Sequence, residues 1–247
     1  MRFAPEFDAG PHPRAQIGFL AVANADLIER DMFAMCPMGV GLHFTRVPMG
    51  TACTLANLAA MEGDLQAALA TLMPARDDTD VITFNCTSAS FVIGDTKVRD
   101  IIQAQRPAVA ATTMVTSVVS ALRALGVRRI AMGTAYTPDI NLMERAFLEA
   151  RGIDCVSMEG LDLLTDRQMN RVSPASLLAF AAHVDRPEAE AVFLSCGALR
   201  SVEILQEAEA RLGKPVICSN QASLWECLRL AGVGDRIAGF GTLLRDL

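Results

Sequence analysis

The chain has 247 residues, which is enough for one large domain or two small lobes. Because 51% of the residues are hydrophobic and only 20% are charged, a large core is available and disorder is disfavoured. The formal net charge of −6 argues against nucleic acid as a partner, since phosphate binding needs a basic face. No apolar stretch reaches the roughly 18–20 residues of a membrane helix, and no secretory signal is recognisable. We therefore expect a cytoplasmic protein without a membrane partner.

Short apolar runs alternate with longer amphipathic segments along almost the whole chain. Strands are predicted at residues 17–23, 41–47, 80–85, 107–112, 128–135, 153–159, 190–196 and 215–219. Helices are predicted at residues 26–35, 54–72, 96–105, 114–125, 141–150, 174–184, 202–212 and 222–230. Near-continuous apolar strands separated by helices are typical of parallel sheets that are covered on both faces. The predicted fold class is therefore α/β.

A weak internal repeat predicts two lobes. The segments RPAVAATTMVTSVVSALRALGV and KPVICSNQASLWECLRLAGV share a basic residue, a proline, a strand, a helix and the ending Leu-Arg-x-x-Gly-Val. We expect two pseudo-symmetric Rossmann-like lobes, each a mainly parallel sheet flanked by helices, with the active site in the cleft between them. The predicted division is a flexible N-terminal tail (1–15), a first lobe (16–112 with 220–247) and a second lobe (113–219).

The seven cysteines contain no C-x-x-C pair, and no histidine lies close to any of them in the sequence. This spacing argues against a disulfide framework and against a structural zinc site, so no metal is predicted. Most of the cysteines, including Cys53 and Cys218, are expected to pack as small buried hydrophobic side chains. Of the two, Cys218 ends a predicted strand and is expected to come nearer to the cleft.

Two of the predicted strands end on a cysteine that is followed by small or hydroxylated residues. These are VITFNCTSAS, which contains Cys86, and AVFLSCGALR, which contains Cys196. Ligands of open α/β sheets gather at the carboxyl ends of the strands, so both cysteines are expected at one cleft. A helix that starts after Cys86 would lower the pKa of its thiol and bind a carboxylate. The glycine after Cys196 would let a substrate approach the backbone closely.

Two thiols that face a bound carbon from opposite sides can remove a proton on one side and return it on the other. Alternatively, one thiolate can add to an activated double bond while the second thiol donates a proton. No lysine or histidine near either cysteine in the sequence could lower a thiol pKa, so a helix terminus is expected to do so. From the residues alone, two ordinary buried strand cysteines remain an alternative.

Five stretches of the chain match a known family: IGFLAVAN, NCTSASFVIG, ALRALGVRRIAMGTAY, LSCGAL and GKPVICSNQASLWECLRLAG. With them the chain resembles the Asp/Glu racemase superfamily from about residue 17 to residue 244, most closely its arylmalonate decarboxylase and maleate cis-trans isomerase branch. The resemblance implies a two-lobed α/β fold and chemistry that needs neither cofactor nor metal. A homo-oligomer is an expectation from the family alone.

The resemblance also implies roles for single residues. Cys86 and Cys196 match the two catalytic thiols of the racemases and of maleate isomerase. Arylmalonate decarboxylases have glycine at the position of Cys86, so a cysteine there favours isomerisation or racemisation over decarboxylation. The substrate-binding residues implied by the resemblance are Thr87, Ser88, Tyr136, Gly197 and, with a displaced register, Asn24.

The predicted function is that of a cofactor-independent two-cysteine isomerase or racemase acting on a small carboxylic or dicarboxylic acid. The motif CTSASFVIGD is similar to a branch found with ectoine and hydroxyectoine utilisation, which suggests one metabolic setting. The main alternative is an arylmalonate-type decarboxylase in which Cys196 alone donates the proton. A ligand-binding sensor on the same two-lobed scaffold is a hypothesis from another class, which the paired thiols disfavour.

Overall fold

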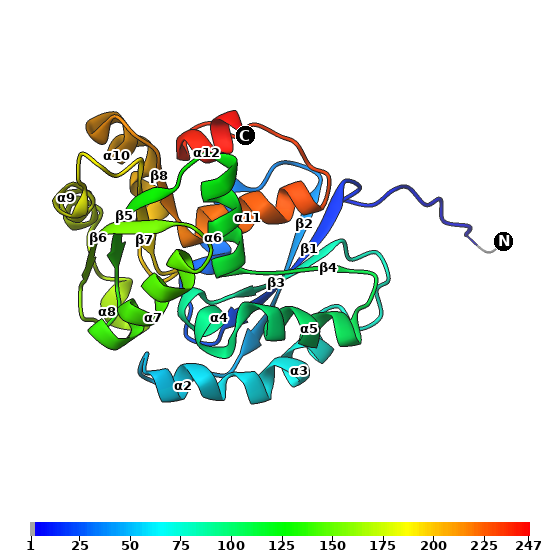
Figure 1. Ribbon diagram of the computed structural model, residues 1–247. Helices are drawn as coiled ribbons and strands as arrows, with labels where there is room; N and C mark the ends of the chain where they lie inside the picture. The colour runs from blue at the N-terminus through cyan, green and yellow to red at the C-terminus, as the bar shows by residue number, and fades with distance from the viewer. Residues whose placement is uncertain (1–2) are drawn as a thin grey trace.

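The structure is a computed structural model and is described here for residues 3–247; it contains two parallel sheets (Figure 1). The first sheet consists of β1 (Ala15–Val22), β2 (Val40–Val47), β3 (Val81–Asn85) and β4 (Ala110–Thr113). The second consists of β5 (Arg129–Thr134), β6 (Asp154–Gly160), β7 (Ala191–Ser195) and β8 (Val216–Cys218). All neighbouring strands pair in parallel. The predicted α/β fold is confirmed.

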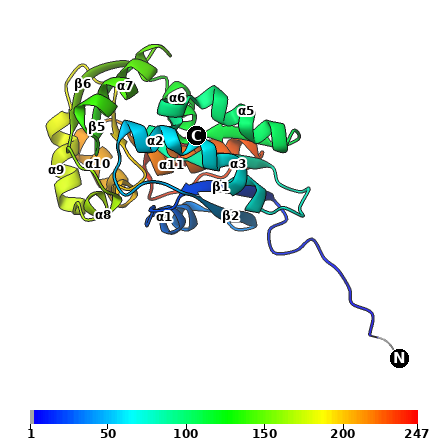
Figure 2. The same ribbon diagram turned by 90° about the horizontal axis from the view of Figure 1, so that it is seen from below.

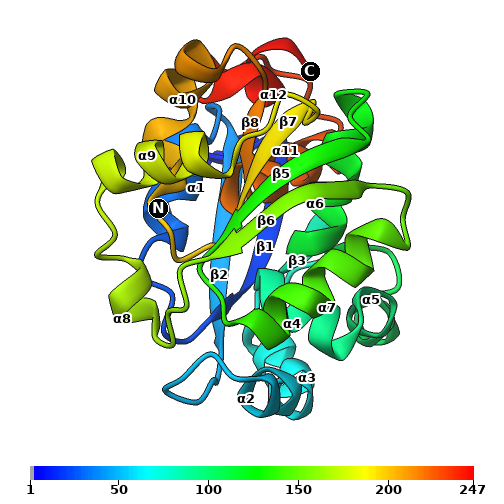
Figure 3. The ribbon, with the colours of Figure 1, turned by 60° about the vertical axis from the view of Figure 1, so that its left-hand side comes forward.

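The two sheets have the same strand order. The first runs β2-β1-β3-β4 and the second β6-β5-β7-β8, so each follows the order second, first, third, fourth within its half of the chain. Figure 3 shows β5 and β7 in front of β1 and β2. The shared order agrees with the pseudo-symmetry that the internal repeat predicted.

The helices lie between successive strands and at the C-terminus. They are α1 (Ile28–Met35), α2 (Leu55–Ala60), α3 (Glu62–Thr71), α4 (Thr87–Ile93), α5 (Asp95–Gln105), α6 (Met114–Ala124), α7 (Pro138–Glu149), α8 (Asp166–Met169), α9 (Pro174–Val184), α10 (Leu205–Leu212), α11 (Ser219–Leu230) and α12 (Gly241–Asp246), with a 3₁₀ helix η1 (Ser201–Ile204). Three of them, α4, α8 and α12, were not predicted as separate helices. The helix predicted over 54–72 is divided in two at Met61.

Helix α11 contacts both sheets. It packs along α6 and contacts β3 and β4 of the first sheet as well as β8 of the second (Figure 1). Strands β3 and β7 are buried at every residue, as near-continuous apolar runs predict. The buried side chains of both sheets form one connected hydrophobic cluster. The boundaries of the two lobes at residues 112 and 219 stay a prediction.

The N-terminal segment before β1 extends away from the rest of the chain (Figure 2). Its described residues, 3–14, are mostly exposed and form no helix or strand. Near its end, Arg14 pairs with Asp235. The predicted flexibility of residues 1–15 stays a prediction, and residues 1 and 2 lie outside the described part. Across residues 3–247, no helix has both the length and the apolar character that crossing a membrane requires.

Candidate active site

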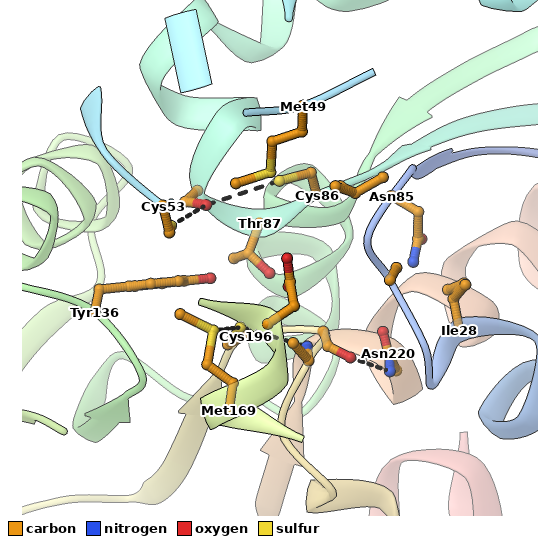
Figure 4. Close-up of a pocket in the computed structure, with 16 residues that line it drawn as sticks. Ile28, Met49, Cys53, Asn85, Cys86, Thr87, Tyr136, Met169, Cys196 and Asn220 are labelled. Carbon is orange, nitrogen blue, oxygen red and sulfur yellow. Dashed lines mark hydrogen bonds between the residues drawn. The ribbon is translucent and has the colours of Figure 1, made fainter. Parts of the chain in front are cut away.

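A cavity lies at the carboxyl ends of strands from both sheets. The empty space in it and at its mouth, including space open to solvent, is about 450 Å³. Residues that follow β3 and β8 line it together with residues that follow β5 and β7 (Figure 4). Six of the seven residues predicted for the site are among its lining: Cys86, Thr87, Ser88, Tyr136, Cys196 and Gly197.

Cys86 follows β3 directly and occupies the cap position before α4. Its Sγ lies 3.7 Å from the hydroxyl of Ser88. Burial raises the pKa of the thiol to about 11, although hydrogen bonds from the backbone N–H groups of Ala89 and Ser88 act in the opposite direction. The helix terminus thus has the predicted sign, but burial outweighs it. Cys86 is therefore a thiol, not a thiolate, at neutral pH.

Cys196 follows β7 in a backbone conformation that side chains rarely adopt. Its φ is 134°, a region that favours glycine, so the turn carries strain at this residue. The N–H of Ala198 donates to its Sγ at 3.4 Å, and its own N–H donates to the Ser219 hydroxyl at 3.2 Å. Burial, followed by repulsion from Asp166, raises the pKa of this thiol well above its usual value. Both predicted catalytic cysteines are thus held protonated.

Tyr136 lies two residues beyond β5 and is buried in the cavity wall. Burial raises the pKa of its phenol well above 10, so the phenol keeps its proton and can donate. A hydrogen bond between the phenol and Cys196 acts to lower the pKa of that thiol. A protonated phenol of this kind can stabilise negative charge that develops on a substrate oxygen.

The two hydroxyl residues after Cys86 are already engaged with sulfur atoms. The Ser88 hydroxyl contacts two thiols, 3.7 Å from that of Cys86 and 3.9 Å from that of Cys53. The Thr87 hydroxyl donates to Sδ of Met114 at 2.9 Å. Sulfur is a weak acceptor, so both hydroxyls can exchange these contacts for a stronger one to a carboxylate.

Asn24 is the predicted residue that the structure does not bring into this cavity. It is exposed and lines a neighbouring, more open groove, and its Nδ2 donates to the carbonyl of Gly50 at 3.3 Å. Its contact with a substrate stays a prediction.

Several lining residues were not predicted. Asn85 and Asn220 are 5% and 2% exposed, and each has one side-chain atom without a hydrogen-bond partner, Nδ2 of Asn85 and Oδ1 of Asn220. Both stand at the carboxyl ends of strands, so the rule that identified the cysteines could have identified them too. Cys53 lines the cavity, whereas Cys218 is buried and is not part of the lining. Cys218 was expected nearer to the cleft than Cys53 because it ends a strand, but this expectation was wrong.

The charge of the cavity is unusual for a carboxylate site. Among the described residues that line it there is no lysine, arginine or histidine, and Asp166 is the one carboxylic acid. Burial raises the pKa of Asp166. Within residues 3–247, no group of three or more His, Cys, Asp and Glu side chains could hold a metal ion. Neutral donors, such as the hydroxyls and backbone N–H groups, are therefore the groups available for a substrate carboxylate.

The fold is shared with solved structures. It superposes on a maleate cis-trans isomerase from Nocardia farcinica that carries a covalently bound succinylcysteine intermediate, with a TM-score of 0.87, 24% identity, and coverage of 94% of this chain and 99% of that chain. Unliganded arylmalonate decarboxylase gives a TM-score of 0.75 at 28% identity, over 93% and 98%. Together with the sequence matches that follow, these likenesses place the chain in the Asp/Glu racemase-like branch of α/β enzymes.

Sequence comparison identifies the family within that class. The sequence pattern of arylmalonate decarboxylase matches residues 55–244. The arylmalonate decarboxylase of Bordetella bronchiseptica is 38% identical over 171 residues, 67% of this chain and 71% of the relative. The maleate isomerase of Nocardia farcinica (strain IFM 10152) is 26% identical over 243 residues, 94% and 96% of the two chains. The chain belongs to the arylmalonate decarboxylase family and is an enzyme of this superfamily, which disfavours the sensor hypothesis.

Proposed function

We propose that this enzyme is a two-cysteine isomerase or racemase of a small carboxylic acid, with Cys86 and Cys196 as its catalytic residues. The observation that carries the proposal is that the two thiols, one from each sheet, line the same cavity. The maleate isomerase with a bound succinylcysteine, which has the same fold, supports a role for cysteine. Neutral hydroxyl groups beside both thiols supply the donors that a carboxylate needs.

In the proposed racemisation, one cysteine loses its proton to solvent as the substrate binds, and the resulting thiolate removes the proton from the carbon next to the carboxylate. The second cysteine, as a thiol, donates its own proton to the opposite face of that carbon. One S–H bond forms as the other breaks, so the pair ends with its protonation states exchanged. Hydrogen bonds from Tyr136, Thr87 and Ser88 would stabilise the enolate-like charge that develops on the carboxylate between the two steps.

In the proposed isomerisation, a thiolate adds to one carbon of the double bond and the other thiol protonates the neighbouring carbon. A carbon–sulfur bond and a carbon–hydrogen bond form, and the former double bond becomes a single bond that can rotate. Reversal of both steps restores the double bond in the other geometry and returns the proton to the second thiol. This route uses the same two cysteines as racemisation.

Decarboxylation by Cys196 alone is the second candidate function. It is favoured by the match to the arylmalonate decarboxylase pattern and by the 38% identical relative of that name. A malonate would lose carbon dioxide, and the thiol would then protonate the resulting carbanion. The cysteine at position 86 disfavours decarboxylation by Cys196 alone, since the arylmalonate decarboxylases that this chain resembles have glycine there.

Solvent deuterium incorporation separates these candidates. The enzyme would be incubated in D₂O with maleate, aryl- and alkylmalonates, aspartate, glutamate, hydantoins and hydroxyectoine-derived amino acids, and each acid analysed by mass spectrometry and for its stereochemistry. Exchange without loss of carbon dioxide supports an isomerase or racemase. Ectoine and hydroxyectoine utilisation is proposed only as a setting from which the last compounds are chosen.

The thiols are then tested with Cys86→Ser and Cys196→Ser. We expect each to lower the rate by on the order of 10²–10⁴, the usual contribution of a positioned acid or base. Cys36→Ser is a matched control, because burial also raises the pKa of Cys36 to about 11 but this residue does not line the cavity. Full activity of Cys86→Ser, with carbon dioxide released, would establish decarboxylation instead.

A further inference from the structure

The carboxyl group of Asp166 lines the cavity, and the one hydrogen bond it accepts among the described residues comes from its own backbone N–H. Asp166 is the first residue of α8, directly after its capping residue Thr165, and it lines both the cavity and the open groove beside it. In the described part of the chain, its carboxylate takes part in no ion pair and accepts no hydrogen bond from another residue. The two arginines nearest in sequence, Arg167 and Arg171, are exposed and line the open groove but not the cavity.

This acid is unfavourable for a substrate with two carboxylates. A dicarboxylate would bring two negative charges into a cavity whose described lining has one acid and no cation. Like charges that share a cavity repel strongly when little water lies between them. Neutral donors can hold one carboxylate, but nothing in the lining compensates a second one beside Asp166.

A second acceptor in the lining also lacks a partner. The amide nitrogen of Asn220 donates to Asp31 at 2.8 Å and to the carbonyl of Gly197 at 3.0 Å, which fixes the orientation of the amide. Its Oδ1 accepts no hydrogen bond although the residue is almost fully buried. A buried acceptor without a donor is destabilising, so a ligand that brings a donor gains free energy there.

One unpartnered donor accompanies these acceptors. The Oδ1 of Asn85 accepts from the Ser223 hydroxyl at 2.6 Å, which leaves its Nδ2 without an acceptor in the lining. Together with the hydroxyls of Thr87 and Ser88, this amide offers donors to a carboxylate. The cavity thus presents donors for one anionic group and acceptors for one cationic group.

We propose that Asp166 binds an ammonium group, so that the substrate is an amino acid with one carboxylate rather than a dicarboxylate. This inference rests on the proposed function and narrows it to racemisation or epimerisation next to an amine. The ammonium would form an ion pair with the carboxylate of Asp166 and donate a hydrogen bond to Oδ1 of Asn220. The proton transfers between carbon and the two thiols are those given above, and the ammonium remains bonded to the substrate throughout.

An ammonium ion would also favour the chemistry of the thiols. Repulsion from Asp166 is among the causes that raise the pKa of Cys86, Cys196 and Cys53. A cation bound to Asp166 offsets this repulsion, and its own charge stabilises a thiolate. The substrate would in this way supply the positive charge that the cavity lining does not contain.

Matched ligand pairs test the inference. 2-Aminobutyrate and ethylmalonate differ only in having an ammonium or a carboxylate on the same carbon, as do phenylglycine and phenylmalonate. For each compound, binding would be measured by calorimetry and exchange of the α-hydrogen by mass spectrometry in D₂O. We expect the wild-type enzyme to bind and exchange the amino acid of at least one pair, and to favour it over its malonate partner about tenfold or more.

Asp166→Asn is the test variant, since it keeps size and removes charge. We expect KM and Kd for the amino acid to rise about tenfold or more, while Kd for the malonate falls or is unchanged. Asp26→Asn is the matched control, because Asp26 lines the open groove but not the cavity. This variant should behave as wild type. Asp166→Ser serves as a second variant if Asp166→Asn does not fold.

The outcomes separate the inference from the proposed function. Exchange of malonates or maleate that depends on both Cys86 and Cys196 but not on Asp166 would overturn the inference and leave the function standing. Equal binding of both members of each pair by wild type and Asp166→Asn would also overturn it. Absence of exchange with every acid tested would contradict the inference and the proposed function together.

Discussion

At the scale of single residues, the two thiols lie in surroundings that oppose ionisation. Cys86 and Cys196 are both desolvated, and Asp166 acts on both in the same direction as burial. The opposing influences are neutral hydrogen-bond donors. The N–H groups of Ala89 and Ser88 and the Ser88 hydroxyl act on Cys86. The N–H of Ala198 and the phenol of Tyr136 act on Cys196. Thiolate formation therefore has to be coupled to substrate binding, since the free enzyme holds its protons.

The alkylation rate of Cys86 follows from its raised pKa. Because that pKa is about 11, we expect the rate with iodoacetamide to rise about tenfold for each pH unit between pH 7 and pH 10. Asp166→Asn removes a charge that raises this pKa, so the variant should react faster at any pH in that range. Peptide mapping by mass spectrometry measures both rates. A rate that levels off below pH 8 would show that the thiol pKa is not raised.

The backbone conformation of Cys196 predicts a difference in stability between two variants. At a φ of 134°, alanine is strained and glycine is not, so Cys196→Gly should be more stable than Cys196→Ala by about 1 kcal/mol. Both variants lack the thiol, which makes the comparison independent of chemistry. Urea denaturation at neutral pH measures the difference. If the alanine variant is equally or more stable, the turn is unstrained.

At the scale of elements, the strands were predictable and some helices were not. Buried parallel strands leave continuous apolar runs, and all eight predicted strands overlap those observed. A helix start was expected after Cys86, but the extent of α4 was not predicted, because its residues Thr87 to Phe91 are all buried and show no helical periodicity of polar and apolar residues. The short α8 likewise has no repeating pattern, although its Thr165–Gln168 capping box could have signalled its start.

Helix α7 and strand β7 are joined through a buried acid, which predicts a pH dependence of stability. The Ser195 hydroxyl donates to Glu144 at 2.6 Å, and burial raises the pKa of Glu144 from its usual 4.5 to about 8. The unfolded chain releases this proton near pH 4.5 and the folded chain near pH 8. The wild type should therefore lose stability relative to Glu144→Gln as pH rises between these values, by up to about 1.4 kcal/mol per pH unit.

Denaturation of both proteins at pH 4, 6 and 8 measures this difference. Below pH 4.5 the gap between them should be constant, since Glu144 is protonated in both the folded and the unfolded state. A gap that stays constant up to pH 8 would mean that Glu144 has an ordinary pKa in the folded protein. Groups elsewhere titrate alike in both proteins and cancel in the comparison.

At the scale of the whole molecule, the repeated strand order places two equivalent strand ends at one cavity. Cys86 and Cys196 follow the third strand of their respective sheets, β3 and β7, which stand at the same position in the two orders. This relation was predictable from the sequence because residues at the carboxyl ends of parallel strands converge. Two half-sites of similar construction are thereby combined into one.

The part of the site that comes from the connections after β2 and β6, including the short helix α8, was not predictable. Cys53, Asp166 and Met169 reach the cavity from segments whose sequences have neither periodicity nor a fixed relation to a strand end. Their positions depend on how the chain between elements folds back, which only the three-dimensional structure shows. Asp166, which we propose as the residue that selects the substrate, belongs to this group.

The central claim is that turnover needs one thiol from each half of the molecule, and Cys86→Gly tests it most directly. Its rates of deuterium exchange, isomerisation or racemisation, and carbon dioxide release would be compared with those of wild type, with folding verified by thermal unfolding. We predict that exchange and stereochemical conversion fall by on the order of 10² or more. A folded Cys86→Gly enzyme that turns over its substrate at the wild-type rate would contradict the two-thiol mechanism.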